Sequence, residues 1–124
     1  MRLLTLATCL TLASCATIGY EQTIASHAYA YADVPLETVW DASIQAIMDM
    51  HHSIESIDRE DGLILARGGE GYTQDKASLP MLTILIKEIE GEVIVTCQYN
   101  TLDIFVEPKK RIGQFFDALN ERLK

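Results

Sequence analysis

The chain has little cysteine, little aromatic content and few positive charges, and each shortage narrows what it can do. It holds 3 cysteines in 124 residues, aromatic residues make up 7% of it, and 10 Lys and Arg stand against 18 Asp and Glu. The net charge of −8 disfavours binding to nucleic acid or to anionic lipid, because both attract proteins mainly through Lys and Arg. Basic residues cluster only at 109–111. We therefore expect no nucleic-acid partner.

Long apolar runs are missing as well. The uncharged stretch 3–13 holds eleven residues, whereas a helix needs about 20 to cross a membrane. The longest later run, 79–86, is interrupted by Pro80 and Thr83. The length and the 48% hydrophobic content suit one globular domain preceded by an N-terminal segment.

The first fourteen residues are typical of a secretory signal peptide. Arg2 supplies a positive start, an apolar stretch follows, and small residues come at its end. Residues 12–15 (Leu-Ala-Ser-Cys) resemble the lipobox of bacterial lipoproteins, in which the cysteine is acylated by groups such as palmitate and the chain is cut before it. The resemblance implies lipidation at Cys15. Residues 6–9 (Leu-Ala-Thr-Cys) are a weaker alternative, because threonine suits the cleavage position less, and an ordinary signal peptide is another.

The same resemblance implies a location. Two or three acyl chains hold a protein at a membrane almost permanently. Ala16 follows Cys15, instead of the aspartate that marks inner-membrane retention in enteric bacteria, which implies the outer membrane, facing the periplasm. We expect a signal peptide over 1–14, the lipidated cysteine and a short tether over 15–26, and one domain over 27–124.

The spacing of apolar residues in the domain predicts strands and two amphipathic helices. Strands are predicted over 27–31, 53–58, 63–67, 82–89 and 93–99, and helices over 33–52 and 108–123. Asp33 is expected near the N-cap of the first helix, with Pro35 in its first turn. The predicted apolar face of that helix holds Leu36, Val39, Trp40, Ser43, Ile44, Ile47 and Met48.

The prediction for the whole domain is an α+β two-layer sandwich. Tight turns join successive strands, which makes them antiparallel. An antiparallel sheet of four to five strands would carry both helices on one face, in the chain order β-α-β-β-β-β-α. Asp61-Gly62 predicts a hairpin, and Ile54 and Ile57 break the two-residue period, which predicts a bulge. The strand 82–89 is expected to be central and the strand 27–31 to lie at an edge.

Two segments of the domain carry a family resemblance. Residues 35–42 (PLETVWDA) and 54–64 (IESIDREDGLI) resemble a family of small bacterial lipoproteins whose shared domain is of unknown function. A more distant likeness extends to lipoprotein accessory components of the outer-membrane β-barrel assembly machine. The resemblance covers roughly residues 27–123 and implies the fold and the envelope location. Its motifs are structural, so it implies no catalytic residue.

Histidines are the first candidates for a metal site, but their spacing is poor. His51 and His52 are adjacent, with Asp49 nearby and His27 elsewhere in the chain. Adjacent side chains on a helix diverge by about 100°, whereas metal-ligand pairs favour spacings such as i, i+4. Histidine near the end of a helix also offsets its dipole. We expect no metal site.

Other candidate groups also have structural explanations. Cys97 falls in the apolar alternation of strand 93–99, which predicts a buried thiol, and it has no partner for a disulfide within the domain once Cys15 is acylated. The stretch 68–71 lacks the Gly-Lys-Ser/Thr ending of a phosphate loop, so a hairpin tip explains it better. Tyr72, which follows it, is a candidate contact residue for a partner. Acidic residues at turns and aromatic residues on helix core faces need no catalytic role: Glu60, Asp61, Glu88, Glu90, Glu92, Trp40, Phe115 and Phe116.

These observations favour a non-enzymatic, membrane-anchored lipoprotein that serves as a protein-interaction or accessory module of the cell envelope. We expect no catalytic residue and no cofactor. Its partners would be the membrane, through the anchor, and an envelope protein that adds a strand at the edge strand 27–31. The alternative is a periplasmic carrier or sensor of an apolar small molecule, which a cavity lined by Ile44, Met48, Leu82 and Phe116 would favour. The sequence leaves the oligomeric state open.

Overall fold

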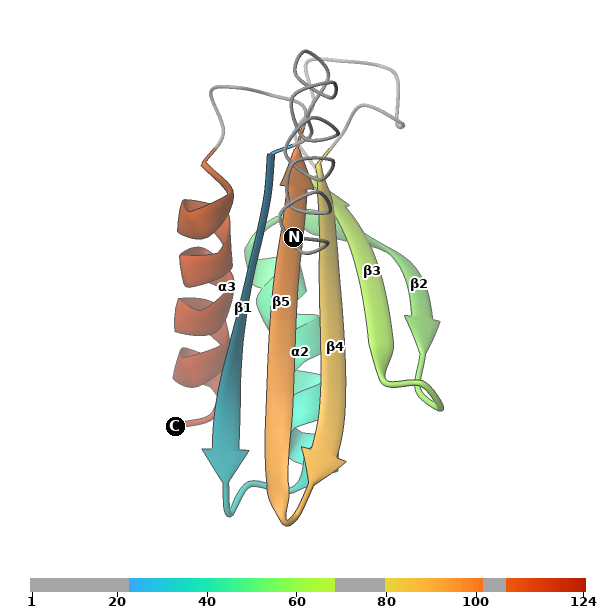
Figure 1. Cartoon of the computed structure of the whole chain (residues 1–124), viewed down its shortest axis with the longest axis vertical. Helices are drawn as coiled ribbons and strands as arrows, with labels where there is room; N and C mark the ends of the chain where they lie inside the picture. Colours follow the sequence, from blue (N-terminus) through green and yellow to red (C-terminus); the bar gives the residue numbers. More distant parts are fainter. Residues whose placement is uncertain (1–22, 69–79, 102–106) are drawn as a thin grey trace, which may run out of the picture.

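Five antiparallel strands form one sheet in the order β1-β5-β4-β3-β2, and two helices pack on it (Figure 1). The computed structural model describes residues 23–68, 80–101 and 107–124. Its elements are β1 (Thr23–Ala32), α2 (Leu36–Asp49), β2 (His52–Asp58), β3 (Leu63–Gly68), β4 (Met81–Ile89), β5 (Glu92–Thr101) and α3 (Pro108–Arg122). The α+β class, the chain order and the central position of β4 are confirmed.

Strand β1 is longer than the sequence pattern indicated. It begins at Thr23, and all ten of its residues pair with β5. The predicted tether 15–26 is wrong over its last four residues, because 23–26 pair with 98–101. Backbone hydrogen bonding extends the strand through a stretch whose side chains show no clear period. The predicted position of this strand at an edge of the sheet is confirmed.

The turn from β1 into α2 differs from the predicted cap. Asp33 has a left-handed φ of 62°, and Pro35 is the N-cap, with no hydrogen bond from its side chain. Because β1 runs directly up to this turn, the chain must reverse sharply, and aspartate tolerates the left-handed conformation better than most residues. At the other end His51 has a φ of 61°, so the helix stops short of the predicted residue 52.

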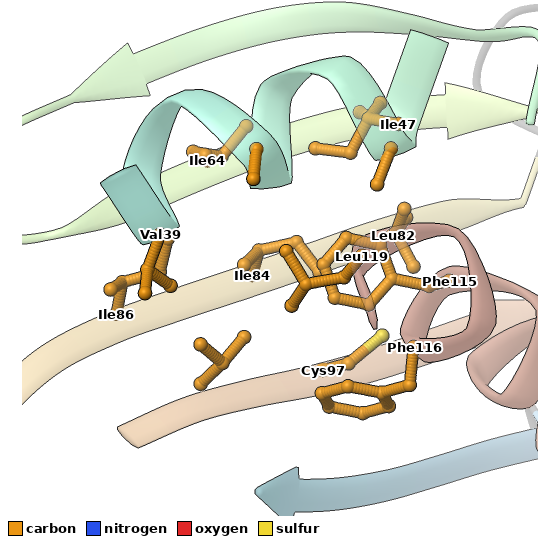
Figure 2. Packing of buried hydrophobic residues seen from close by; sticks show 14 of the residues in the cluster. Val39, Ile47, Ile64, Leu82, Ile84, Ile86, Cys97, Phe115, Phe116 and Leu119 are labelled. Atoms are coloured by element: carbon orange, nitrogen blue, oxygen red, sulfur yellow. The ribbon is translucent and has the colours of Figure 1, made fainter. Parts of the chain in front are cut away.

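The core lies between one face of the sheet and the two helices. Figure 2 shows side chains from the sheet meeting those of both helices: Ile64, Leu82, Ile84, Ile86 and Cys97 with Val39, Ile47, Phe115, Phe116 and Leu119. The buried residues of α3 are Pro108, Ile112, Phe115, Phe116 and Leu119. On α2, Ala42 and Ala46 are buried while Leu36 and Met48 are 38% and 54% exposed. The buried stripe of α2 is therefore turned from the predicted face: it gains the two alanines and keeps Val39, Trp40, Ser43 and Ile47.

Two local features of the sheet are as predicted. The pairing of β2 with β3 shifts between Ile54 and Ser56, which is the predicted bulge. The turn between these strands ends at Gly62, whose φ is +70°. The Gly62 carbonyl accepts a hydrogen bond of 2.7 Å from the Ile86 N–H. The β2–β3 turn is thereby fastened to β4.

Candidate binding groove

Strand β1 lies at one edge of the sheet, with α3 beside it (Figure 1). It pairs with β5 along one side only. Along its other side, alternate N–H and C=O groups have no partner among the described residues. Such an edge can accept a further strand from another protein.

A groove of about 530 Å³ runs between β1 and α3. Its strand side is formed by residues 24–27 and Tyr29, and its helix side by Lys109, Ile112, Gly113, Phe116, Asp117 and Asn120. The helix residues recur every three or four positions, which places them on one face of α3. The groove therefore follows the helix along most of its length.

Three aromatic rings from the two sides of the groove meet, and together we call them its aromatic wall. The Phe116 and Tyr29 rings meet edge to face, with centroids 4.5 Å apart. The His27 ring lies 4.7 Å from Tyr29 and 6.2 Å from Phe116. Pairs with this geometry are mutually favourable. Because Tyr29 keeps 49% of its surface exposed, the wall offers a preformed aromatic surface to a ligand.

Tyr31 fixes β1 to α3 at one end of the groove. Its hydroxyl donates a hydrogen bond of 2.9 Å to Asn120 Oδ1. Burial, with a further contribution from Tyr29, raises the pKa of Tyr31 to about 12. The phenol therefore stays protonated near neutral pH and remains a donor. This contact holds the strand and the helix at a fixed spacing.

Charges of opposite sign stand on the groove face of α3. Lys109 and Asp117 are eight residues apart, which corresponds to about 12 Å along a helix. Neither forms an ion pair with another described residue. Gly113 lies midway between them, and a Cβ added there would meet no atom within 4 Å. The helix face is therefore open at its centre and charged on either side.

The sequence analysis did not identify Gly113 or Asp117 as site residues. One signal was available, because Gly113 interrupts the predicted helix 108–123. Glycine inside a helix costs about 1 kcal/mol relative to alanine, and in this case no neighbouring atom requires it. The open space over Gly113 leaves room for a ligand to approach the helix.

The structure does not bring the metal candidates together. His27 lines the groove, whereas His51 is exposed in the turn after α2. His52 Nδ1 donates to a backbone carbonyl over 3.0 Å, and burial is the main cause that lowers the pKa of His52. Asp49 forms two hydrogen bonds to the guanidinium of Arg122. In the part of the chain that the structure describes, no three His, Cys, Asp or Glu side chains are placed to hold a metal ion.

Cys97 is buried in the core, as predicted. Its exposed fraction is 0%, and burial raises the pKa of its thiol to about 12. The thiolate is the reactive form of cysteine, so a buried thiol with this pKa is a poor nucleophile.

We expect the Cys97 thiol to resist alkylation while the protein is folded. Iodoacetamide at mildly alkaline pH should modify it roughly a hundredfold more slowly in native protein than in concentrated urea, because the group must first become exposed and ionise. Intact mass measured on timed, quenched samples gives both rates. Equal rates in the two conditions would show an accessible thiol and contradict the buried position.

The four residues whose common cavity would have favoured an apolar ligand are dispersed. Phe116 lines the groove, but Leu82 is fully buried and Met48 is 54% exposed. Ile44 is half-buried on α2. The rotated face of α2 moves Met48 out of the interior. These four residues therefore do not line a common cavity, and the candidate site lies beside β1.

The remaining candidates fall in two groups. Cys15, Tyr72 and residues 69–71 lie outside the described residues. Trp40 is buried as predicted, and the Arg59 guanidinium lies 5.3 Å from the centre of its ring. The acidic residues at the turns are exposed, as expected.

No helix in the described ranges is long and apolar enough to cross a membrane.

Comparison with known proteins gives similarities of structure alone. No family model matches the chain, and no curated protein matches it. The structure of Ara h 8.0201 is similar at 12% identity and a TM-score of 0.43, covering 82% of this chain and 99% of that one. TTHA0849 from Thermus thermophilus is similar at 12% identity and a TM-score of 0.41, covering 83% of this chain and 97% of that one.

Proposed function

We propose that the chain is a lipid-anchored, non-enzymatic protein-interaction module of the bacterial cell envelope, held at the outer membrane by Cys15. The lipobox-like residues 12–15 support the anchor, and the resemblance of 35–42 and 54–64 to small lipoproteins supports the location. β1 begins at Thr23, eight residues after Cys15, so the connection reaches at most about 28 Å. The domain would therefore stay close to the bilayer.

The free edge of β1 beside the groove carries the proposal. A segment of a partner that pairs with β1 would satisfy the unpaired backbone groups on this edge. Every second side chain of that segment would enter the groove between β1 and α3. In this mode the main chain supplies affinity and the groove supplies specificity. Such a role needs no reactive group.

Two groups that catalysis could use lie away from the groove, which supports an interaction role. The Cys97 thiol is enclosed by the core, and its pKa is raised to about 12. Burial lowers the pKa of His52, and its Nδ1 is already bonded to the backbone. Neither side chain lines the groove.

A photo-crosslinking residue at Ser26 is expected to capture an envelope protein. Ser26 is exposed on β1 and lines the groove, so p-benzoylphenylalanine there would lie against a strand added at this edge. Glu60 is the matched control, because it is exposed in the β2–β3 turn, away from the groove. After illumination of living cells, immunoblots should show a discrete adduct for the Ser26 variant alone. Identical adducts from both positions, or none from Ser26, would contradict the proposal.

The second candidate function is a carrier or sensor of an apolar small molecule. The aromatic wall favours it, and the groove volume of about 530 Å³ lies within the usual range for small-molecule sites. Protein purified from membranes would then release a stoichiometric apolar compound on organic extraction, as measured by mass spectrometry. Release of such a compound, together with no adduct from Ser26, would replace the first proposal with this one.

A further inference from the structure

We propose that the groove beside β1 takes an extended segment of a partner protein that carries a basic, an apolar and an acidic residue at alternate positions, in that order from its N-terminus. The inference rests on the proposed function, because it specifies what the edge of β1 binds. It depends on the direction of β1 and α3, on the spacing of Lys109 and Asp117, and on the open space at Gly113.

The direction of the segment follows from the sheet. All four strand pairs are antiparallel, and antiparallel pairing is slightly the more stable kind. β1 and α3 run in the same direction, because Phe116 contacts Tyr29 and, one helical turn later, Asn120 bonds to Tyr31. A segment antiparallel to β1 therefore runs from the Asp117 end of the groove towards the Lys109 end.

The spacing of the two unpaired charges selects the positions of the charged residues. Lys109 and Asp117 are about 12 Å apart along α3, and four residues of an extended strand cover about 13 Å. Residues i and i+4 of a strand also lie on the same face. A basic residue at i would meet Asp117, and an acidic residue at i+4 would meet Lys109. This complementarity distinguishes the segment from an uncharged apolar ligand.

The middle position, i+2, falls over the open centre of the helix face. A Cβ at Gly113 would contact nothing within 4 Å, so a large side chain of the partner has room there. Ile112 and Phe116 flank this space on α3. An apolar, and especially an aromatic, side chain at i+2 would pack chiefly against the exposed part of Tyr29, because Phe116 is only 3% exposed.

A second copy of the chain is a poorer occupant. If β1 paired with β1 of another molecule, the inserted side chains would come from TIASHAYAYA. That strand has no Lys, Arg, Asp or Glu, so it would leave Lys109 and Asp117 unpaired. The charges on the groove therefore favour a different protein.

The test compares two peptides with the full acylated chain in detergent micelles. The matched peptide is Thr-Lys-Val-Phe-Val-Glu-Thr, and the reversed peptide exchanges its Lys and Glu. Fluorescence anisotropy should show the matched peptide binding about tenfold more tightly, because the reversed peptide places like charges together. The double variant Lys109→Glu/Asp117→Lys keeps the net charge and should prefer the reversed peptide by a similar factor. Both side chains are exposed, so the exchange should leave the fold intact.

Gly113→Leu provides a steric test at the same site. The new side chain would fill the groove without meeting a neighbouring atom at its Cβ, and leucine is a better helix former than glycine. We expect binding of the matched peptide to weaken at least tenfold while the midpoint of urea unfolding does not fall. Unchanged binding by this variant would overturn the inference.

Three other outcomes would also overturn it. Equal affinity for the two peptides, or no reversal in the double variant, would show that the charges do not select the ligand. A dimer seen by analytical ultracentrifugation that Gly113→Leu dissociates would identify a second copy as the occupant. Absence of peptide binding while Ser26 still captures an envelope protein would reject the segment and leave the proposed function in place. Absence of both would reject the proposed function as well.

Discussion

Replacement of Gly62 by alanine is expected to lower the free energy of unfolding by about 3 kcal/mol or more, which would be a large effect for a turn residue. Gly62 has a φ of +70°, which costs an L-residue free energy. A Cβ at this position would lie 2.1 Å from the Ile86 carbonyl oxygen, which is backbone of the central strand. The Gly62 carbonyl also accepts the Ile86 N–H, so the turn cannot move away without losing that bond.

Gly91 provides the matched control for this substitution. It also has a positive φ, +83°, but a Cβ there would meet nothing within 4 Å. Gly91→Ala should therefore lower the free energy of unfolding by only about 1–2 kcal/mol, which is the cost of a positive φ for an L-residue. Urea unfolding of the two variants, followed by circular dichroism, measures both values. A Gly62→Ala variant no less stable than Gly91→Ala would show that the turn does not rest on β4 as described.

Gly62 also shows what the sequence could predict about the fold. The pair Asp61-Gly62 indicated the hairpin, and the irregular spacing of Ile54 and Ile57 indicated the bulge that β2 contains. These features depend on a few neighbouring residues, so local patterns reveal them. The contact of Gly62 with Ile86 could not be predicted, because it depends on the packing of a turn against a strand that follows 24 residues later.

The helix α2 was predicted less well, for a physical reason. The pattern favoured a stripe that included Leu36 and Met48, because large apolar residues dominate any measure of periodicity. In the structure Ala42 and Ala46 face the core and those two larger residues are largely exposed. Which face of a helix is buried depends on how closely the helix approaches the elements beside it. That distance cannot be predicted from the sequence of one helix.

The groove could be predicted least of all. Its two sides come from 24–29 and 109–120, which are at least eighty residues apart in the chain. The sequence analysis expected strand addition at 27–31, and the edge position of that strand is confirmed. It did not place α3 beside the strand, so Lys109 and Asp117 had no relation to it. On α3 the sequence offered one signal, Gly113, a glycine in a helix that otherwise follows the apolar pattern.

Substitution of Cys15 by serine is expected to remove the protein from the membrane fraction. Without the thiol no diacylglycerol can be attached, and each CH₂ lost from the bilayer forfeits about 0.8 kcal/mol of binding free energy. Fractionation of cells, with intact mass of the purified chain, should find the wild type in membranes, starting at Cys15 and acylated. The variant should carry no acyl group and should appear in the soluble fraction.

Cys9 makes the matched control, because it ends the weaker lipobox-like sequence at residues 6–9. Cys9→Ser should leave acylation, cleavage and membrane location unchanged. If Cys9→Ser releases the protein and Cys15→Ser does not, the anchor is Cys9, and the connection to β1 lengthens by six residues, or about 20 Å. If neither substitution changes the mass or the location, the chain has no lipid anchor. The proposed role at the outer membrane would then fail, while the binding preference of the groove could still be tested with the peptides.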